Sequence, residues 1–372
     1  MGYFKNINLE NYRNFNNFQL DFSSGCNILI GPNGSGKTNI LESISLFERG
    51  RGIRKENIKN LINNKSKKQH FKITSIFSHK LNNINLLIEN QTNDFNMRKK
   101  IFINEDSSKE STKYLENIFS LIYFLPEMER LFLNSPSIRR NFLDRLIYSF
   151  NKNYNKIINN YKKNILERSN LLKNNNYDAD WINSLEKEIV SLGMEIYDLR
   201  KKHLFEINNH LENIGYKKLY PYQISLTLKD TLFNDAFSNH RELEEVFLAQ
   251  LKNNRSLDAI LGGCKIGPHK SDIEGRNIED NFNLNQFSTG QQKTIILLII
   301  LAQCKLLINN YNIIPVILFD EVCSHLDEEN RKLLLDIIEK LEVQTFMTGT
   351  DKRLFSFLST KAKYCNINDS TL

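Results

Sequence analysis

The chain has 372 residues, of which 40% are hydrophobic and 25% charged, and it carries a formal net charge of +7. This is the composition of a soluble globular protein of one large or two medium domains, and the surplus of positive charge favours an anionic partner. The five cysteines show no C-x-x-C pair and no metal-ligand spacing, and the longest apolar run, residues 295–302, is too short to cross a bilayer. The opening residues lack the apolar stretch of a signal peptide. We therefore expect a cytoplasmic protein with reduced thiols and no membrane partner.

The first thirty residues predict strands, the last of which is the apolar run Cys26–Ile30 ending at Gly31. From Gly36 onward, apolar residues recur at spacings of three and four, which indicates a helix. Further apolar runs predict a hairpin and one more strand: residues 71–77 and 84–88, joined across Asn82-Asn83, and residues 100–103.

The middle of the chain, residues 121–213, has little glycine and shows helical spacing, so we expect a helical subdomain there. Heptads are not sustained, which excludes a long coiled coil. The asparagine-rich segment 151–176 is typical of compositional bias and receives no function.

The last third alternates between helix and strand. Residues 294–307 predict an apolar helix, Val316–Phe319 a buried strand, residues 331–341 a helix and residues 343–347 another strand. Strands that alternate with helices indicate a parallel α/β sheet.

One glycine-rich segment fits G-x-x-x-x-G-K-[ST] in full and lies between a predicted strand and a predicted helix. The glycines let the backbone surround phosphates with N–H groups, and the helix N-terminus adds its positive dipole end. Lys37 is expected to reach the β- and γ-phosphates of ATP, and the Thr38 hydroxyl to bind Mg²⁺. The expected ATP-binding residues are Gly31, Pro32, Asn33, Gly34, Ser35, Gly36, Lys37, Thr38 and Asn39.

The strand Val316–Phe319 is followed by two acids. An Asp at the end of a buried strand is how P-loop proteins hold Mg²⁺, so Asp320 is the expected second metal ligand. Glu321 is placed to activate the attacking water, which gives a candidate catalytic set of Glu321, Asp320 and Lys37. Without the P-loop, a solvated acidic turn would be the favoured interpretation.

A third motif, Ser288-Thr289-Gly290-Gln291, stands at the start of the apolar helix and resembles the signature motif of ABC ATPases. Alone, Ser288 would be a helix N-cap. The resemblance implies that Ser288, Gly290 and Gln291 contact the γ-phosphate of an ATP molecule bound to a second subunit. Residues 324–327 then resemble the D-loop that follows the acidic strand in this class.

The stretch of chain between Lys37 and Asp320 is too long for a transporter cassette and too short for a full-length SMC protein. The chain resembles the RecF family over nearly its whole length. The similar segments are residues 9–15, 38–44, 50–54, 124–127, 135–144, 267–272 and 345–351. Thr289 and Lys293 depart from the family's usual residues, and residues 148–261 match weakly, so no functional residue is transferred to that region.

The resemblance implies an ABC-type, SMC-like ATPase head with an α/β lobe and a helical second lobe. We expect residues 1–120 to form the first part of the ATPase lobe, 121–290 the helical lobe, and 291–372 the rest of the ATPase lobe. The resemblance also implies slow ATP hydrolysis, an ATP-dependent homodimer, and binding to single-stranded, duplex and gapped DNA. The implied partners are RecR and RecO, and indirectly RecA and single-strand-binding protein, in DNA repair, recombination and replication.

Basic residues that follow the P-loop helix support DNA binding independently, since cations contact phosphates. Arg51, Arg54 and Lys55 are the candidates, with a solvated charged surface as the alternative. Two other functions stay open. One is a different SMC-like or transporter-type ATPase head, and the other is a DNA scaffold that binds ATP without hydrolysing it.

Overall fold

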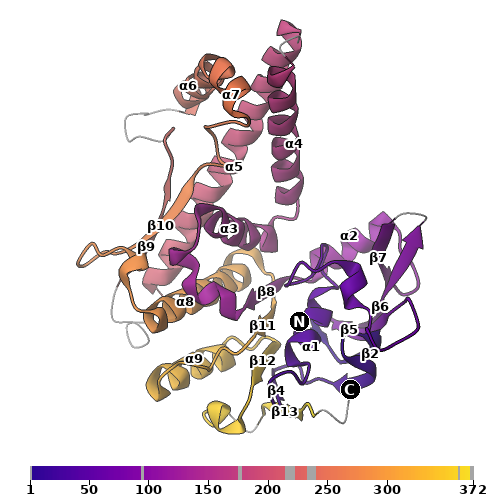
Figure 1. The fold of residues 1–372 in the computed structure, drawn as a ribbon. Helices are drawn as coiled ribbons and strands as arrows, with labels where there is room; N and C mark the ends of the chain where they lie inside the picture. Colours follow the sequence, from indigo (N-terminus) through magenta and orange to yellow (C-terminus); the bar gives the residue numbers. More distant parts are fainter. Residues whose placement is uncertain are drawn as a thin grey trace. The chain divides into compact units, whose positions relative to one another are not determined.

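The computed structural model describes residues 2–93, 96–174, 178–213, 223–232, 240–358 and 361–368. The chain forms two compact units (Figure 1). The first comprises Met1–Glu129 and Lys293–Leu372, and the second Arg130–Lys217 and Pro221–Gln292. The described chain passes from the first unit to the second after Glu129 and returns to the first unit within a single helix, α8 (Thr289–Tyr311).

A five-stranded sheet in the first unit has the order β13-β4-β12-β11-β8, and its described pairs are parallel. The expected parallel α/β sheet is therefore confirmed. Its strands are β4 (Cys26–Ile30), β8 (Leu121–Phe124), β11 (Val316–Phe319), β12 (Thr345–Gly349) and β13 (Lys363–Asn366). The expectation of helix from residue 121 was wrong at β8, because these four buried apolar residues pair with β11.

A second sheet of the first unit is antiparallel and has the order β3-β2-β5-β6-β7, with β1 paired to β5. Its strands are β1 (Gly2–Phe4), β2 (Asn6–Tyr12), β3 (Phe15–Asp21), β5 (Lys72–His79), β6 (Asn82–Asn93) and β7 (Asn96–Ile103). The expected hairpin is β5-β6. Its turn is not at Asn82-Asn83, because Asn82 pairs with His79 in the ladder; the chain reverses at Lys80, whose φ is +55°, and Leu81.

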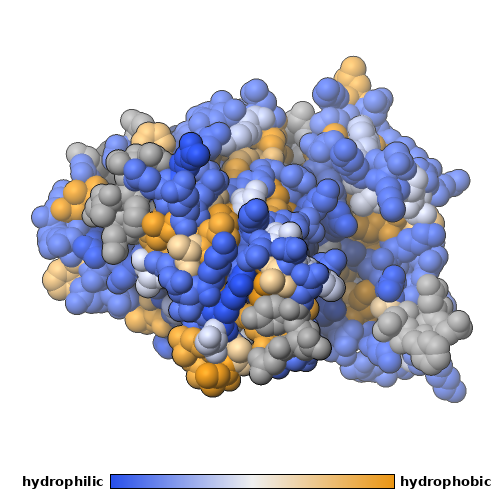
Figure 2. Space-filling view, turned by 90° about the horizontal axis from the view of Figure 1, so that it is seen from above, coloured by the Kyte–Doolittle hydropathy of each residue, from blue (hydrophilic) through white to orange (hydrophobic). Residues whose placement is uncertain are grey.

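The helices of the first unit are α1 (Lys37–Ser45), α2 (Lys109–Ile118), α9 (Glu328–Lys340) and most of α8. Among the described residues, α8 is the one helix long and apolar enough to cross a membrane by composition, but 72% of its apolar window is buried in the protein. Its apolar side chains are thus explained as protein core. The face seen in Figure 2 is mainly hydrophilic, with apolar residues in small groups.

The core of the first unit joins residues from distant parts of the chain. The ring of Phe4 lies 5.5 Å from that of Phe47, 5.0 Å from that of Phe77 and 5.3 Å from that of Phe119. The buried side chain of Gln344 accepts from the Phe4 N–H at 2.8 Å and donates to the Phe4 carbonyl at 2.7 Å. Because the Gln344 amide bonds to both backbone groups of Phe4, this contact holds the end of β1 next to the start of β12.

The second unit is mainly helical. Figure 1 shows α4 and α5 side by side as a long hairpin, with α6 and α7 near one end of it. Its helices are α3 (Pro136–Phe150), α4 (Tyr154–Lys173), α5 (Ala179–Asn213), α6 (His240–Asn253) and α7 (Arg255–Leu261). The whole of α4 lies within the asparagine-rich segment 151–176, whose last two residues are outside the described residues. Two antiparallel strands complete the unit: β9 (Ile224–Lys229) and β10 (Asp272–Asn277).

A buried ionic network fixes this hairpin to α7. The fully buried guanidinium of Arg168 donates to Glu186 at 2.9 Å and to Asp258 at 2.7 Å. Arg255 pairs with the second oxygen of Glu186 at 2.6 Å. Two arginines therefore face two carboxylates, so the buried charges balance.

Candidate nucleotide-binding site

The glycine-rich segment forms a tight loop between β4 and α1. Gly34 and Gly36 have φ of +86° and +96°, a region that side-chain-bearing residues rarely adopt. A Cβ at Gly36 would also lie 2.5 Å from the Phe15 ring. The chain therefore needs glycine here both for its backbone conformation and for the close packing of the β2-β3 turn. Ser35, also buried, leaves its Oγ without a hydrogen-bond partner among the described residues.

The ammonium group of Lys37 lies at this loop. It donates to the carbonyls of Gly31 and Pro32, both at 2.7 Å, and the side chain is almost fully buried. Burial lowers the pKa of Lys37, and the nearby carboxylates Glu321 and Asp320 oppose this shift. The loop therefore holds a desolvated cation that donates to two backbone carbonyls, in a position that suits an anionic ligand.

Two side chains from separate elements meet at the carboxylate of Asp320, the residue that follows β11. The Thr38 hydroxyl, on α1, lies 3.1 and 3.0 Å from its two oxygens. The Thr348 hydroxyl, on β12, donates to it at 2.7 Å and accepts from the Glu321 N–H at 2.8 Å. Sequence reasoning placed Thr348 in the RecF-like segment 345–351 but assigned it no role at the site. Its place at the carboxyl end of a parallel strand next to β11 was the available signal.

Glu321 begins the turn after β11 with a φ of +49°, in the left-handed region. Lys293 stabilises that turn: its ammonium donates to the carbonyls of Glu321 at 3.3 Å and Ser324 at 2.6 Å. The same ammonium pairs with Glu129 at 2.7 Å and is almost completely buried. The residue that departs from the RecF pattern at position 293 therefore positions the acidic turn.

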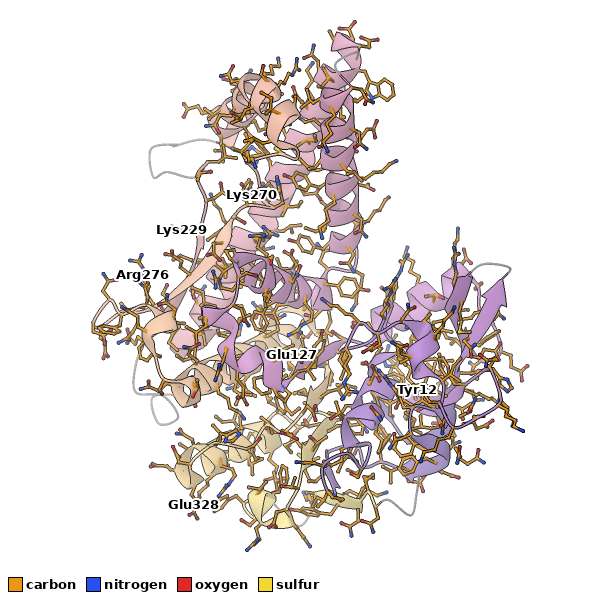
Figure 3. All side chains as sticks on the ribbon, in the orientation of Figure 1. Tyr12, Glu127, Lys229, Lys270, Arg276 and Glu328 are labelled. Carbon is orange, nitrogen blue, oxygen red and sulfur yellow. The ribbon has the colours of Figure 1, made fainter. Side chains whose placement is uncertain are left out.

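A buried cluster anchors α1, the helix that follows the glycine-rich loop. Glu42, on α1, accepts from Arg13 at 2.8 and 2.7 Å and from the Tyr12 hydroxyl at 3.0 Å. Tyr12 lies inside the first unit (Figure 3). Burial, and then the charge of Glu42, raise the pKa of Tyr12 far above its usual range, so the hydroxyl keeps its proton and remains a donor.

The three candidate DNA-binding residues, Arg51, Arg54 and Lys55, are exposed. Arg54 also donates to Asn39 at 2.9 Å, and Asn39 donates to Asn14 at 2.7 Å. Arg54 therefore connects the basic segment to the first turn of α1. A contact between DNA and these residues stays a prediction.

The signature-like segment belongs to the second unit. Ser288 Oγ accepts from the Gln291 N–H at 3.3 Å, and Gln291 Oε1 accepts from the Ser288 N–H at 2.9 Å. This reciprocal pair is a capping box, which fixes the first turn of α8. Ser288 and Gln291 are exposed and Gly290 is half-exposed. The segment is thus a rigid helix start on the surface, and its role in a second subunit's site stays a prediction.

The residues at the loop suit a magnesium–phosphate ligand. In the described part of the chain, no three His, Cys, Asp or Glu side chains gather to hold a metal ion by themselves. Mg²⁺, however, is usually bound by one or two protein groups together with substrate phosphates and water. The Thr38 hydroxyl and the Asp320 carboxylate converge closely enough to serve as those groups.

Comparison with known proteins agrees with this arrangement. The RecF/RecN/SMC N-terminal domain family matches residues 3–369. The DNA replication and repair protein RecF of Rickettsia conorii is 32% identical over 358 residues, covering 96% of this chain and 97% of that protein. RecF of Rickettsia prowazekii is 31% identical over 345 residues, covering 93% of each chain.

Two solved structures show the same fold. The recombination mediator RecF with ATP superimposes with a TM-score of 0.82 at 24% identity, covering 99% of this chain and 98% of that chain. The Smc head domain from Pyrococcus furiosus has a TM-score of 0.54 at 18% identity, covering 96% and 92%. The expected ABC-type, SMC-like head, with an α/β and a helical part, is confirmed. From the family match and the identity to its members, this chain belongs to the RecF family of DNA replication and repair proteins.

Proposed function

We propose that this protein is an ATP-dependent, DNA-binding recombination mediator. The observation that carries the proposal is the convergence of Lys37, Thr38 and Asp320 at the glycine-rich loop. A solved relative of the same fold is described as RecF with ATP, in the RecFOR pathway. The buried, unpartnered Ser35 hydroxyl at the loop also suits a phosphate oxygen.

In this proposal each residue of the site has one task. The loop N–H groups and Lys37 bind the β- and γ-phosphates of ATP, and Thr38 and Asp320 hold Mg²⁺, which neutralises phosphate charge when bound. Glu321 orients the attacking water and accepts its proton. Thr348 fixes Asp320 and Glu321 relative to each other through its single hydroxyl. Hydrolysis is slow, as the resemblance to RecF implies.

The site is completed by a second copy of the chain. The exposed helix start at Ser288, Gly290 and Gln291 of one subunit covers the γ-phosphate bound by the other, so two ATP molecules lie in an isologous dimer. ATP binds this closed dimer more tightly than the monomer, and that difference drives association. Loss of the γ-phosphate removes the contact and opens the dimer.

The dimer acts on DNA in the cytoplasm. It binds gapped DNA and junctions of single-stranded and duplex DNA, with Arg51, Arg54 and Lys55 among the phosphate contacts. RecR and RecO are its direct partners, and the assembly helps RecA to load onto DNA coated by single-strand-binding protein. The family membership supports this role, since the curated relatives are DNA replication and repair proteins.

Sedimentation of a Ser288→Arg variant tests the proposal. With ATP and Mg²⁺, we expect the wild-type chain to dimerise and the Ser288→Arg variant to remain monomeric. The long arginine side chain would obstruct the helix start that covers the partner's γ-phosphate. ATP affinity of the monomer should change by less than about threefold, since Ser288 contacts only the partner's nucleotide.

Ser288→Thr is the matched control, because it keeps a hydroxyl able to cap α8. It should dimerise as the wild type does. Dimerisation of Ser288→Arg at the wild-type ATP concentration would refute the shared site.

A further inference from the structure

The second unit contains a cavity of about 180 Å³, with both polar and apolar walls, that the nucleotide site does not use. Its walls are α3, α4, α5 and the turn at residues 267–271. Two of the segments that resemble the RecF family, residues 135–144 and 267–272, meet here although they are far apart in the sequence. The polar and charged side chains of its lining include Ser137, Arg140, Asn141, Lys162, Arg200 and His269.

The turn at residues 267–269 forms a rigid, uncharged wall. A Cβ at Gly267, whose φ is +112°, would lie 2.4 Å from the Tyr161 hydroxyl. That hydroxyl is 2.7 Å from His269 Nδ1, and His269 Nε2 is 2.9 Å from the Cys264 carbonyl. Since a carbonyl only accepts, Nε2 carries the proton and Nδ1 accepts from Tyr161. Burial, reinforced by nearby Lys and Arg charges, lowers the pKa of His269 to about 4, so the ring is neutral at pH 7.

The two carboxylates around the cavity are already matched by arginines. Arg200 binds both oxygens of Asp144, each at 2.9 Å, and donates to the Pro268 carbonyl at 2.6 Å. Arg139 binds both oxygens of Asp272, each at 2.7 Å. Bidentate pairs of this kind neutralise each other and fix both side chains.

Arg140 and Lys162 leave a surplus of positive charge. Arg140 is half-buried and donates to a neutral acceptor, the Ser271 carbonyl, at 2.5 Å; it forms no ion pair with any described residue. Burial and then the charge of Arg200 lower the pKa of Arg140, and the charges of Asp272 and Asp144 oppose this shift. Lys162 adds a further cation from the exposed side of α4, and Ser137 and Asn141 add neutral donors.

The size of the cavity selects the kind of anion. A water molecule occupies about 30 Å³ in the liquid, so the space corresponds to roughly six waters. Sites for whole drug-sized ligands are larger, about 300–1,000 Å³. One phosphate group with a few waters fits this volume.

We propose that this cavity binds one phosphate of the DNA backbone, through Arg140 and Lys162 with Ser137 and Asn141 as neutral donors. It gives the helical unit a DNA contact of its own, in addition to the basic segment after α1. The inference rests on the DNA-binding function proposed above. DNA is favoured over free phosphate because Lys162 is exposed at the cavity, where a continuous strand can pass.

The test compares variants of two adjacent lysines on α4. Lys162→Glu places a negative charge at the cavity, whereas Lys163→Glu makes the same change about 100° around the helix. With a fluorescent gapped duplex, we expect Lys162→Glu to weaken binding about tenfold and to lower the slope of log affinity against log salt by about one or more. Lys163→Glu should stay within about twofold of the wild type.

Arg140→Gln is the second variant, since it removes the charge but keeps a donor for the Ser271 carbonyl. It should weaken DNA binding in the same way, with the unit's folding followed by the fluorescence of Trp181, the single tryptophan. Inorganic phosphate at millimolar concentration should raise the unfolding midpoint of the wild type more than that of either cavity variant.

Two outcomes overturn the inference while leaving the proposed function intact: equal weakening by both lysine variants, or no weakening by either, with wild-type DNA binding preserved. A third outcome is that inorganic phosphate no longer raises the unfolding midpoint of the cavity variants, while their DNA affinity stays unchanged. This would assign the cavity to a free anion and overturn the DNA assignment. Failure of the wild type itself to bind DNA counts against the proposed function instead.

Discussion

At the scale of single residues, one hydroxyl joins the carboxylate of Asp320, the proposed metal ligand, to the backbone of Glu321, the proposed water-activating residue. Thr348 Oγ1 donates to Asp320 and accepts from the backbone of Glu321, so it uses both of its hydrogen-bonding capacities. The side chain is fully buried, and water cannot replace it without rearrangement. Thr348 is therefore a positioning residue for the proposed hydrolysis.

Replacing Thr348 by Val tests this role, because Val has nearly the same shape and lacks the hydroxyl. Loss of a hydrogen bond to a charged group is worth about 1.5–3 kcal/mol, so ATP turnover should fall about ten- to hundredfold. ATP affinity should change much less, since Lys37 and the loop are untouched. The measurement is steady-state phosphate release together with nucleotide binding.

Thr348→Ser keeps the hydroxyl and should retain most of the turnover. If the Val and Ser variants hydrolyse ATP equally fast, the hydroxyl does not position Glu321.

At the scale of elements, the sequence predicted the parts of the fold whose pattern is local. The apolar runs gave β4 and β11, and the glycine-rich motif gave the loop before α1. β8 was missed because four apolar residues suit a helix as well as a strand, and its partner β11 lies far along the chain. The network of Arg168 and the cavity near Arg140 depend on side chains brought together only by folding.

The buried network in the second unit is expected to determine the stability of the α4-α5 hairpin. Arg168→Met leaves the Asp258 carboxylate buried without its charge partner, which should destabilise the unit by about 3–5 kcal/mol. Urea unfolding followed through Trp181, on α5, reports on this unit selectively.

Arg241→Met, on α6, is the matched control, because its pair with Glu245 is exposed and worth about 1 kcal/mol or less. A common midpoint for the two variants would show that the buried network adds no stability.

At the scale of the whole molecule, the candidate DNA-binding residues can be separated from the nucleotide site. Arg54 touches Asn39 at the first turn of α1, so changing it also alters the P-loop helix. Arg51 is exposed and is the cleaner probe. Arg51→Glu should weaken binding to all DNA sequences alike and reduce the salt slope by about one or more, without loss of ATP-driven dimerisation.

Lys109→Glu, at the start of α2, makes the same change of charge on an exposed position of the same unit. Salt titrations of DNA binding should leave this control near the wild-type slope. Identical slopes for Arg51→Glu and the wild type would assign the DNA surface to other residues.

The strand order of the parallel sheet also governs how the chain folds during synthesis. β11 and β12 lie between β8 and β4, yet both emerge from the ribosome after the entire helical unit. At about 5–20 residues per second, they follow β8 by on the order of ten to forty seconds. Throughout that interval, β4 and β8 are apolar strands whose intervening neighbours have not been made, and unpaired strand edges invite aggregation. The helical unit can fold first, whereas the nucleotide-binding unit must wait for its two central strands.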